Sequence, residues 1–184
     1  MRAKRRRNTT SEKEIFKRVH TKTFREKIKK AQKEELNTKD LEQMMKNITD
    51  FLGVFPCDQI SSLRANFQTP KFLIVNLDGS FLSGSHWIGL RIDKKTIEIF
   101  DSLGFDLKIW KILPLPLLNF LNSLRKTRAL FYSPVLQLSS ELNCGLYCAY
   151  FILYRKFRTF SDCLSVFNMR RLEKNQSILI NLLS

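Results

Sequence analysis

The sequence predicts an α+β domain in which a group of strands lies between helical segments. Three observations predict this class. The chain has 184 residues, 43% of them hydrophobic, which suffices for one globular domain with a real core. Short apolar runs with the composition of strands cluster between residues 71 and 101. The segments before and after that region place apolar residues at helical spacing.

The N-terminal part of the chain is predicted to be helical and strongly basic. Residues 11–35 carry a thin apolar stripe at helical spacing. A second helix is predicted to start near Thr38, a good capping residue, and to stop before Gly53. We therefore expect a basic arm or helix over residues 1–37 and a globular domain over residues 38–184.

Three strands are predicted in the middle of the chain. The run "KFLIVNL" is closed by an Asp78-Gly79 turn signal, and "HWIGLRI" and "TIEIFD" flank the polar "DKK". After Gly104, "PLPLLNFLNSLRK" predicts a helix entered through prolines, followed by irregular or extended chain. The last third of the chain, from Cys144 on, is predicted to be helical.

The two later strands are predicted to form a hairpin that turns at residues 94–95. Opposing Ile92 to Ile97 gathers five branched apolar side chains on one face, whereas a slip of one residue scatters them over both faces. In this register His86 and Asp101 share a face at diagonal positions, roughly 7 to 8 Å apart at the backbone. An imidazole and a carboxylate can bridge that gap.

A carboxylate that accepts a hydrogen bond from one ring nitrogen orients a histidine and stabilises its protonated form. The other nitrogen of His86 is then free to act as a base. The hairpin alone leaves a second interpretation open, in which His86 is a structural histidine and Asp101 caps the turn "DSLG".

Cys144 is predicted to be the first residue of a helix, because it follows the capping residue Asn143 and precedes an apolar helical stripe. The macrodipole and free N–H groups at a helix start stabilise a thiolate. Backbone N–H groups there, together with the amide of Gln137, could receive an oxyanion. Taken alone, Cys144 could also be a buried packing residue, as Cys148 one turn later is expected to be.

The other cysteines and the two histidines argue against disulfides and metal sites. Four cysteines in a chain of this length, with no secretion signal, are too few and too scattered for a disulfide scaffold. With only two histidines, no ligand set of recognisable zinc spacing exists, so we expect no metal. No apolar run approaches the roughly 18 residues of a membrane span, so we expect an intracellular protein that is neither secreted nor bound to a membrane.

The net charge of +15 is concentrated at the N-terminus. Residues 1–35 hold 14 Lys and Arg against 5 Glu, which gives +9 of the total. Such an excess favours polyanions, with nucleic acid the first candidate. The candidate DNA contacts are Arg5, Arg6, Arg7, Lys29 and Lys30. A solvated basic helix with a nuclear-import signal at "KRRR" is the alternative interpretation.

Four sites occur in a characteristic order: His86-Trp87, Asp101 in "FDSLG", Gln137, and Cys144-Gly145. With "FLGVFPCDQI", "IVNLDGSFLSGSHW" and "NCGLYCAYF", this set resembles the papain-related cysteine proteases of the adenovirus endopeptidase (adenain) branch and their SUMO-specific, Ulp-type relatives. The resemblance covers residues 50 to 160 approximately. It implies a mixed central sheet packed against helices, with the nucleophile at a helix N-terminus.

Carried over to this chain, the resemblance implies that Cys144 is the nucleophile and that His86 is the general base and later the acid. Asp101 would orient the histidine, and Gln137 with the Cys144 backbone amide would form the oxyanion hole. The chain departs from the adenovirus enzymes in having Asp where they usually have Glu. Residues 102–136 also lack the cysteine to which those enzymes can bond their activating peptide.

The adenovirus enzymes process capsid and core precursors, use viral DNA as a cofactor and are activated by a short basic peptide. By resemblance we expect a monomeric endopeptidase that acts on structural precursor proteins in the host nucleus or virion. DNA and an activating peptide are its expected cofactors, and none is required by the chemistry. Two alternatives stay open: a protease that deconjugates SUMO or ubiquitin-like proteins, and a basic nucleic-acid-binding module without catalysis.

Overall fold

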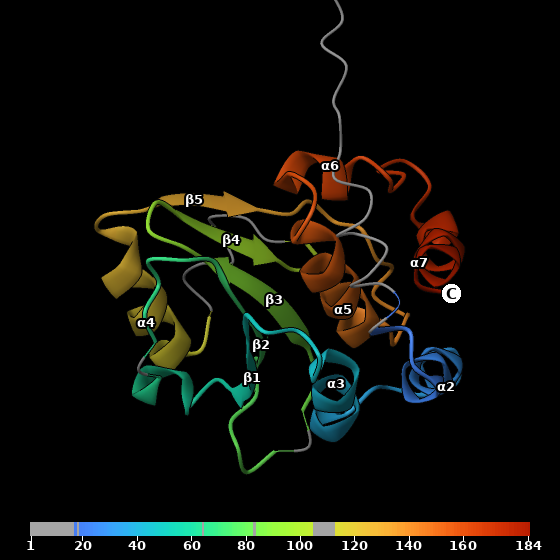
Figure 1. Cartoon of the computed structure of the whole chain (residues 1–184), viewed down its shortest axis with the longest axis horizontal. Coiled ribbons are helices and arrows are strands. Elements are labelled where there is room, and N and C mark those ends of the chain that lie inside the picture. The colour runs from blue at the N-terminus through green and yellow to red at the C-terminus, as the bar shows by residue number, and fades with distance from the viewer. Residues whose placement is uncertain (1–16, 18, 64, 83, 105–112) are drawn as a thin grey trace, which may run out of the picture.

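A five-stranded sheet with helices on both faces forms the centre of the protein in the computed structural model (Figure 1), which describes residues 17, 19–63, 65–82, 84–104 and 113–184. In this part of the chain the helices are α2 (Lys22–Ala31), α3 (Thr38–Met45), α4 (Leu115–Arg125), α5 (Cys144–Arg155), α6 (Phe160–Leu164) and α7 (Asn175–Leu183), with 3₁₀ helices η1 (Ile60–Ser62) and η3 (Leu172–Lys174). None of the helices in the described ranges is long and apolar enough to cross a membrane.

The sheet is mixed, and its strands follow chain order. The strands are β1 (Phe51–Pro56), β2 (Lys71–Asn76), β3 (Trp87–Ile92), β4 (Thr96–Phe100) and β5 (Ala129–Tyr132). The three central strands β2, β3 and β4 are antiparallel, and the two outer strands each run parallel to their neighbour. The predicted α+β class with a mixed sheet packed against helices is therefore confirmed.

The β3–β4 hairpin has the predicted register. Leu90 pairs with Ile99 and Ile92 with Ile97, and the chain turns at residues 94–95. The alternation of side chains along these strands divides the sheet into two apolar faces. The branched face, with Ile92 and Ile97, packs against Leu117 and the rest of α4, while the opposite face packs against α5.

Helix α5 is the central helix of the larger core. Every residue from Cys144 to Tyr154 is buried, which explains why the segment "CGLYCAYFILY" is apolar on all sides. The helix approaches β3 closely at Gly89, where an added Cβ atom would lie 2.9 Å from a ring carbon of Phe151. A residue larger than glycine on this face of β3 would push α5 away from the sheet.

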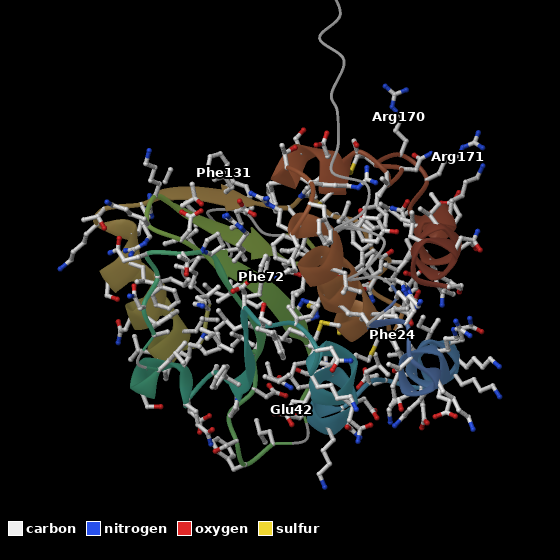
Figure 2. All side chains as sticks on the ribbon, viewed as in Figure 1. Phe24, Glu42, Phe72, Phe131, Arg170 and Arg171 are labelled. Atoms are coloured by element: carbon white, nitrogen blue, oxygen red, sulfur yellow. The ribbon has the colours of Figure 1, made fainter. Side chains whose placement is uncertain are left out.

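The N-terminal helices α2 and α3 pack into the same core as α5. Phe24 and Ile28 of α2 are buried in this core, and in Figure 2 Phe24 points inward from its helix. Lys27 and Lys30 of α2 both form ion pairs with the buried Asp40 of α3, which fixes the two helices to each other. The boundary between residues 37 and 38 stays a prediction, although the helices on either side of it form one packed unit.

Several predicted boundaries differ from those observed. In the predicted helix of residues 11–35, Lys17 and Val19 are helical, and the separate helix α2 starts at Lys22 behind the capping residue Thr21. Residues 11–16 and 18 lie outside the described part of the chain. The second helix has Asn37 as its cap and ends at Met45. The predicted helix up to Gly53 was wrong in its last part, because Phe51–Pro56 forms strand β1. Strand β5 lies in the stretch that was predicted to be irregular or extended.

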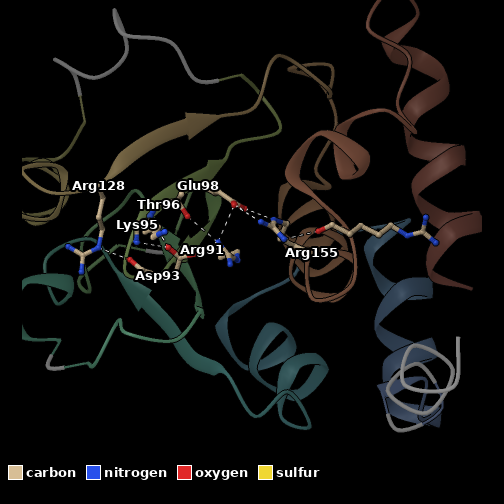
Figure 3. A network of polar contacts seen from close by, with 8 residues as sticks. Arg91, Asp93, Lys95, Thr96, Glu98, Arg128 and Arg155 are labelled. Carbon is tan, nitrogen blue, oxygen red and sulfur yellow. Dashed lines mark hydrogen bonds and ion pairs between the residues drawn. The ribbon is translucent and has the colours of Figure 1, made fainter. Parts of the chain in front are cut away.

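A buried ion network fixes the C-terminal end of α5 to the hairpin (Figure 3). Glu98 of β4 accepts two hydrogen bonds from Arg155 of α5, both of 2.7 Å, and one of 3.1 Å from Arg91 of β3. A cavity of about 520 Å³ opens beside these residues. Since α5 rises 1.5 Å per residue, this cavity lies roughly 16 Å along the helix from Cys144.

Candidate active site

His86 and Asp101 meet where the central strands end. His86 directly precedes β3, and Asp101 directly follows β4. The antiparallel pairing of the two strands therefore brings both residues to the same end of the strands. The Nε2 atom of His86 lies 2.7 Å from Oδ1 of Asp101. The two side chains are 12% and 6% exposed, so the pair is largely removed from water. The contact predicted from the hairpin register is present.

Asp101 is held in place by the backbone around it. Its Oδ1 atom also accepts a hydrogen bond of 2.9 Å from the Leu103 N–H. The buried hydroxyl of Ser133 accepts from the Asp101 N–H at 2.8 Å and donates to the Asp101 carbonyl at 2.6 Å. The segment after β5 therefore fixes the main chain of the acid, while the turn after β4 fixes its carboxylate.

Cys144 is the first residue of α5, as predicted, and it is buried. Asn143 occupies the cap position, but its side chain makes no capping hydrogen bond, so the expected cap is absent. The first turn of α5 contains no acidic residue that would oppose a thiolate. The thiol thus stands at the positive end of a twelve-residue helix.

The Asp101 carboxylate, hydrogen-bonded to His86, and the nearby Cys144 thiol both favour the protonated form of the ring. Burial of the ring acts in the opposite direction, but the two acidic partners outweigh it and raise the pKa of His86 to about 10. Because Asp101 binds Nε2, Nδ1 is the ring nitrogen that remains for the thiol. The order thiol, imidazole, carboxylate is the arrangement required for an activated nucleophile.

Gln137 is 2% exposed and belongs to the same buried polar group. Its Nε2 atom donates a hydrogen bond of 2.6 Å to the carbonyl of Glu141, in the loop that leads into α5. Its Oε1 atom accepts one of 2.6 Å from the hydroxyl of Ser102, the neighbour of Asp101. One N–H of the amide is thus used within the loop, and the second has no hydrogen-bond partner among the described residues.

The sequence did not indicate the residues that surround this group. Ser102 and Ser133 were not predicted, since their partners lie more than thirty positions away along the chain. Residue Leu36, just before α3, accepts a hydrogen bond of 3.1 Å from the Trp87 indole N–H. It also packs with Leu41 against Gly145, the neighbour of the nucleophile.

Cys148 packs beneath the site, as predicted. Its Sγ atom donates a hydrogen bond of 3.4 Å to the Trp87 carbonyl, and burial raises its pKa well above the ordinary value. Burial also raises the pKa of Cys57, with help from two nearby aspartates, and raises that of Cys163 to about 12. These three thiols are therefore kept in the protonated, unreactive form.

The other predicted contacts lie elsewhere. Lys29 is exposed on α2, whereas Lys30 pairs with Asp40 at 2.8 Å. Arg5, Arg6 and Arg7 lie outside the described residues. Across the described ranges, no group of three or more His, Cys, Asp or Glu side chains could hold a metal ion.

Comparison with known proteins gives one family and a set of similar structures. The sequence model of the family described as adenovirus endoprotease matches residues 51–170. Among solved structures, the ASFV pS273R protease is similar with a TM-score of 0.52 and 16% identity, over 81% of this chain and 68% of that one. This likeness supports the shared fold.

A weaker likeness joins the chain to the SUMO protease Ulp1, with a TM-score of 0.33 and 23% identity over 62% of this chain and 52% of that one. No curated protein sequence matches the chain.

Proposed function

Because this chain belongs to the adenovirus endoprotease family, we propose that it is a cysteine endopeptidase with Cys144 as the nucleophile. His86 is the general base and later the acid, and Asp101 orients its ring. The observation that supports these roles is the position of His86, whose Nε2 atom lies 2.7 Å from Oδ1 of Asp101 and whose ring is near enough to the Cys144 thiol to interact with it electrostatically.

The acylation step follows from this arrangement. The Cys144 thiolate attacks the scissile carbonyl carbon, a C–S bond forms, and the carbonyl electron pair moves to oxygen. The second N–H of the Gln137 amide and the backbone N–H of Cys144 stabilise that oxyanion. Protonated His86 donates its proton to the amide nitrogen as the C–N bond breaks, and the amine leaves.

Hydrolysis of the thioester regenerates the enzyme. Neutral His86 removes a proton from water, and the resulting hydroxide attacks the acyl carbon. The intermediate collapses with cleavage of the C–S bond, which releases the acid and the thiolate beside protonated His86. Throughout both steps Asp101 keeps the ring oriented and stabilises its positive charge.

We propose structural precursor proteins of a virus or virus-derived element as the substrates, cleaved by a monomer in the host nucleus or virion. Deconjugation of SUMO or ubiquitin-like proteins is the competing activity, since the same chemistry cleaves the tail of a folded protein. The two activities are distinguished by measuring cleavage of a purified capsid precursor and of a purified ubiquitin-like precursor, each with and without DNA. Cleavage of the capsid precursor alone, faster with DNA, supports the proposal, and cleavage of the ubiquitin-like precursor alone contradicts it.

We propose DNA and an activating peptide as cofactors, and the DNA proposal is supported by exposed charges at one edge of the molecule. Helices α2 and α7 lie side by side there (Figure 1), and His20 Nε2 contacts the Leu183 carbonyl at 2.9 Å. Lys29 is exposed on α2, and Arg170 and Arg171 project outward before α7 (Figure 2). Arg5, Arg6 and Arg7 remain part of this proposal.

Salt dependence of binding tests the DNA contact. Replacing Lys29 and Arg171 by glutamine should weaken DNA binding and reduce the slope of log affinity against log salt by about 1 per lost phosphate contact. Lys94→Gln, at the exposed turn of the hairpin, is the matched control. An equal effect of the control would show that net charge alone, rather than this edge, determines binding.

The catalytic assignment is tested by peptide hydrolysis. Cys144→Ala should abolish cleavage and leave DNA affinity unchanged, whereas Cys148→Ala should retain cleavage because burial keeps the Cys148 thiol protonated. Full activity of the Cys144→Ala protein would refute the assignment, and a basic module without catalysis would show no Cys144-dependent cleavage at all.

A further inference from the structure

We propose that Ser102 is a positioning residue for the Gln137 amide, so that the acid and the oxyanion donor belong to one hydrogen-bonded unit. This inference rests on the proposed function, because it assigns a role within the same site. It concerns a residue that neither contacts the scissile bond nor carries a charge, and it starts from a buried contact between side chains 35 positions apart.

The Ser102 hydroxyl has a defined role in that contact. Ser102 is 1% exposed, and its Oγ atom lies 2.6 Å from Oε1 of Gln137. An amide oxygen can only accept, so the serine hydroxyl is the donor. No other side chain or backbone group donates to Oε1 in the described structure, and the Gln137 side chain is itself buried. Removal of the hydroxyl would therefore leave a buried acceptor without a partner.

The backbone of Ser102 strengthens the connection. Its carbonyl accepts hydrogen bonds from two successive N–H groups, those of Leu136 at 2.8 Å and Gln137 at 2.9 Å. Main chain and side chain of Gln137 are thus both attached to the same residue. Because Ser102 directly follows Asp101, any movement of the turn that carries the acid would also move the amide.

The two bonds of the amide define which way it faces. The Glu141 carbonyl, 2.6 Å from Nε2, can only accept, and Ser102 donates to Oε1. A flipped amide would place its oxygen against the Glu141 carbonyl, which is repulsive. It would also direct an oxygen rather than an N–H toward a developing oxyanion. Ser102 therefore keeps the donor end of Gln137 available for the transition state.

Two reagents separate the oxyanion site from the nucleophile. Iodoacetamide alkylates Cys144 without forming an oxyanion, so its rate reports the thiolate beside His86. The Cys144 thiol adds to the carbonyl carbon of a peptide aldehyde, and the former carbonyl oxygen then occupies the oxyanion site. We expect Ser102→Ala to weaken aldehyde inhibition about tenfold and to lower kcat by a similar factor, with KM unchanged. This is less than the 10²- to 10³-fold typical of a deleted donor, because the amide remains.

Three further variants complete the experiment. Gln137→Ala should weaken the aldehyde at least as much as Ser102→Ala does, and the double variant should show no additional loss. Ser102→Thr, which retains a hydroxyl, should restore most of the affinity. Thr159→Ala removes the cap of α6, near the other end of α5, and should change neither the affinity for the aldehyde nor the rate of alkylation by iodoacetamide.

The outcomes distinguish this inference from the proposed function. If Gln137→Ala weakens the aldehyde but Ser102→Ala does not, the role of Ser102 is refuted and the oxyanion donor stands. The positioning role is also refuted if Ser102→Ala weakens aldehyde binding by the same factor in the Gln137→Ala background as in the wild type. It is refuted as well if Ser102→Ala slows alkylation by iodoacetamide by the same factor as it weakens the aldehyde. If Gln137→Ala leaves aldehyde affinity unchanged, the proposed oxyanion site itself fails.

Discussion

The indole N–H of Trp87 donates a hydrogen bond of 3.1 Å to the backbone carbonyl of Leu36. This bond joins the residue beside His86 to the segment between α2 and α3, which lies before the region that matches the family, residues 51–170. Leu36 also contacts Gly145, beside Cys144. The N-terminal helices thus support the neighbours of both the base and the nucleophile.

Trp87→Phe should therefore destabilise the protein. The substitution removes the indole donor and part of a buried ring, which together cost about 1–3 kcal/mol. Thermal or denaturant unfolding measures this loss. A variant with unchanged stability would show that the contact with Leu36 contributes nothing to the packing of the N-terminal segment.

The charge of Asp40 should make the stability of the N-terminal helices fall at acidic pH. Burial would raise the pKa of this carboxyl, but hydrogen bonds from Lys27, Lys30 and the Asn37 N–H lower it below its usual value. The resulting stability is present above the unfolded-state pKa and is lost as the pH falls through the lower folded-state value.

Asp40→Asn should cost about 2 kcal/mol at pH 7, because two lysines lose their partner. The difference in unfolding free energy between the two proteins should shrink as the pH approaches 3. A difference that is the same at pH 7 and pH 3 would show that the charge of Asp40 contributes nothing.

The stability that His86 contributes should be lost in base, whereas that of Asp40 is lost in acid. Its pKa in the folded protein, about 10, lies above the ordinary value of 6.5, because Asp101 and Cys144 outweigh burial. The stability that this adds is fully present below about pH 6.5 and is lost as the pH rises through 10. The difference in melting temperature between the wild type and His86→Gln should narrow over that interval. A constant difference would contradict the raised pKa.

Asp101→Asn should reduce activity by at least about tenfold, because the neutral amide no longer stabilises protonated His86. The second-order rate of Cys144 alkylation at neutral pH should fall with it, and the alkaline limit of peptide cleavage, which needs protonated His86, should move to lower pH. Asp93→Asn, in the turn of the same hairpin, serves as the control. Normal alkylation and cleavage by Asp101→Asn would show that the carboxylate does not act through His86.

The parts of this site that sequence could predict are those fixed by local periodicity. Five branched residues define the register of the β3–β4 hairpin, and that register brings His86 to Asp101. The helix start at Cys144 is marked by a change from polar loop to continuous apolar sequence. Both features depend on neighbours within twenty positions.

The parts that sequence could not predict depend on distant contacts. Strand β1 contains Gly53, at a φ of 136°, and Pro56. Both residue types are uncommon inside strands, so the sequence did not indicate a strand there. The branched face of the hairpin packs on α4, whereas α5 lies on the other face, so alternation alone does not place Cys144. Ser102 was interpreted only as part of a turn, because its partner Gln137 lies on another segment.

Labelling with a peptide-based, thiol-directed probe at neutral pH, followed by mapping of the modified residue, is the most direct test of Cys144 as the nucleophile. We expect modification of Cys144 alone, since burial raises the pKa of Cys57, Cys148 and Cys163. The rate should fall strongly in His86→Gln. Modification of Cys57 or Cys163 with Cys144 untouched would contradict the claim that Cys144 is the nucleophile of this protein.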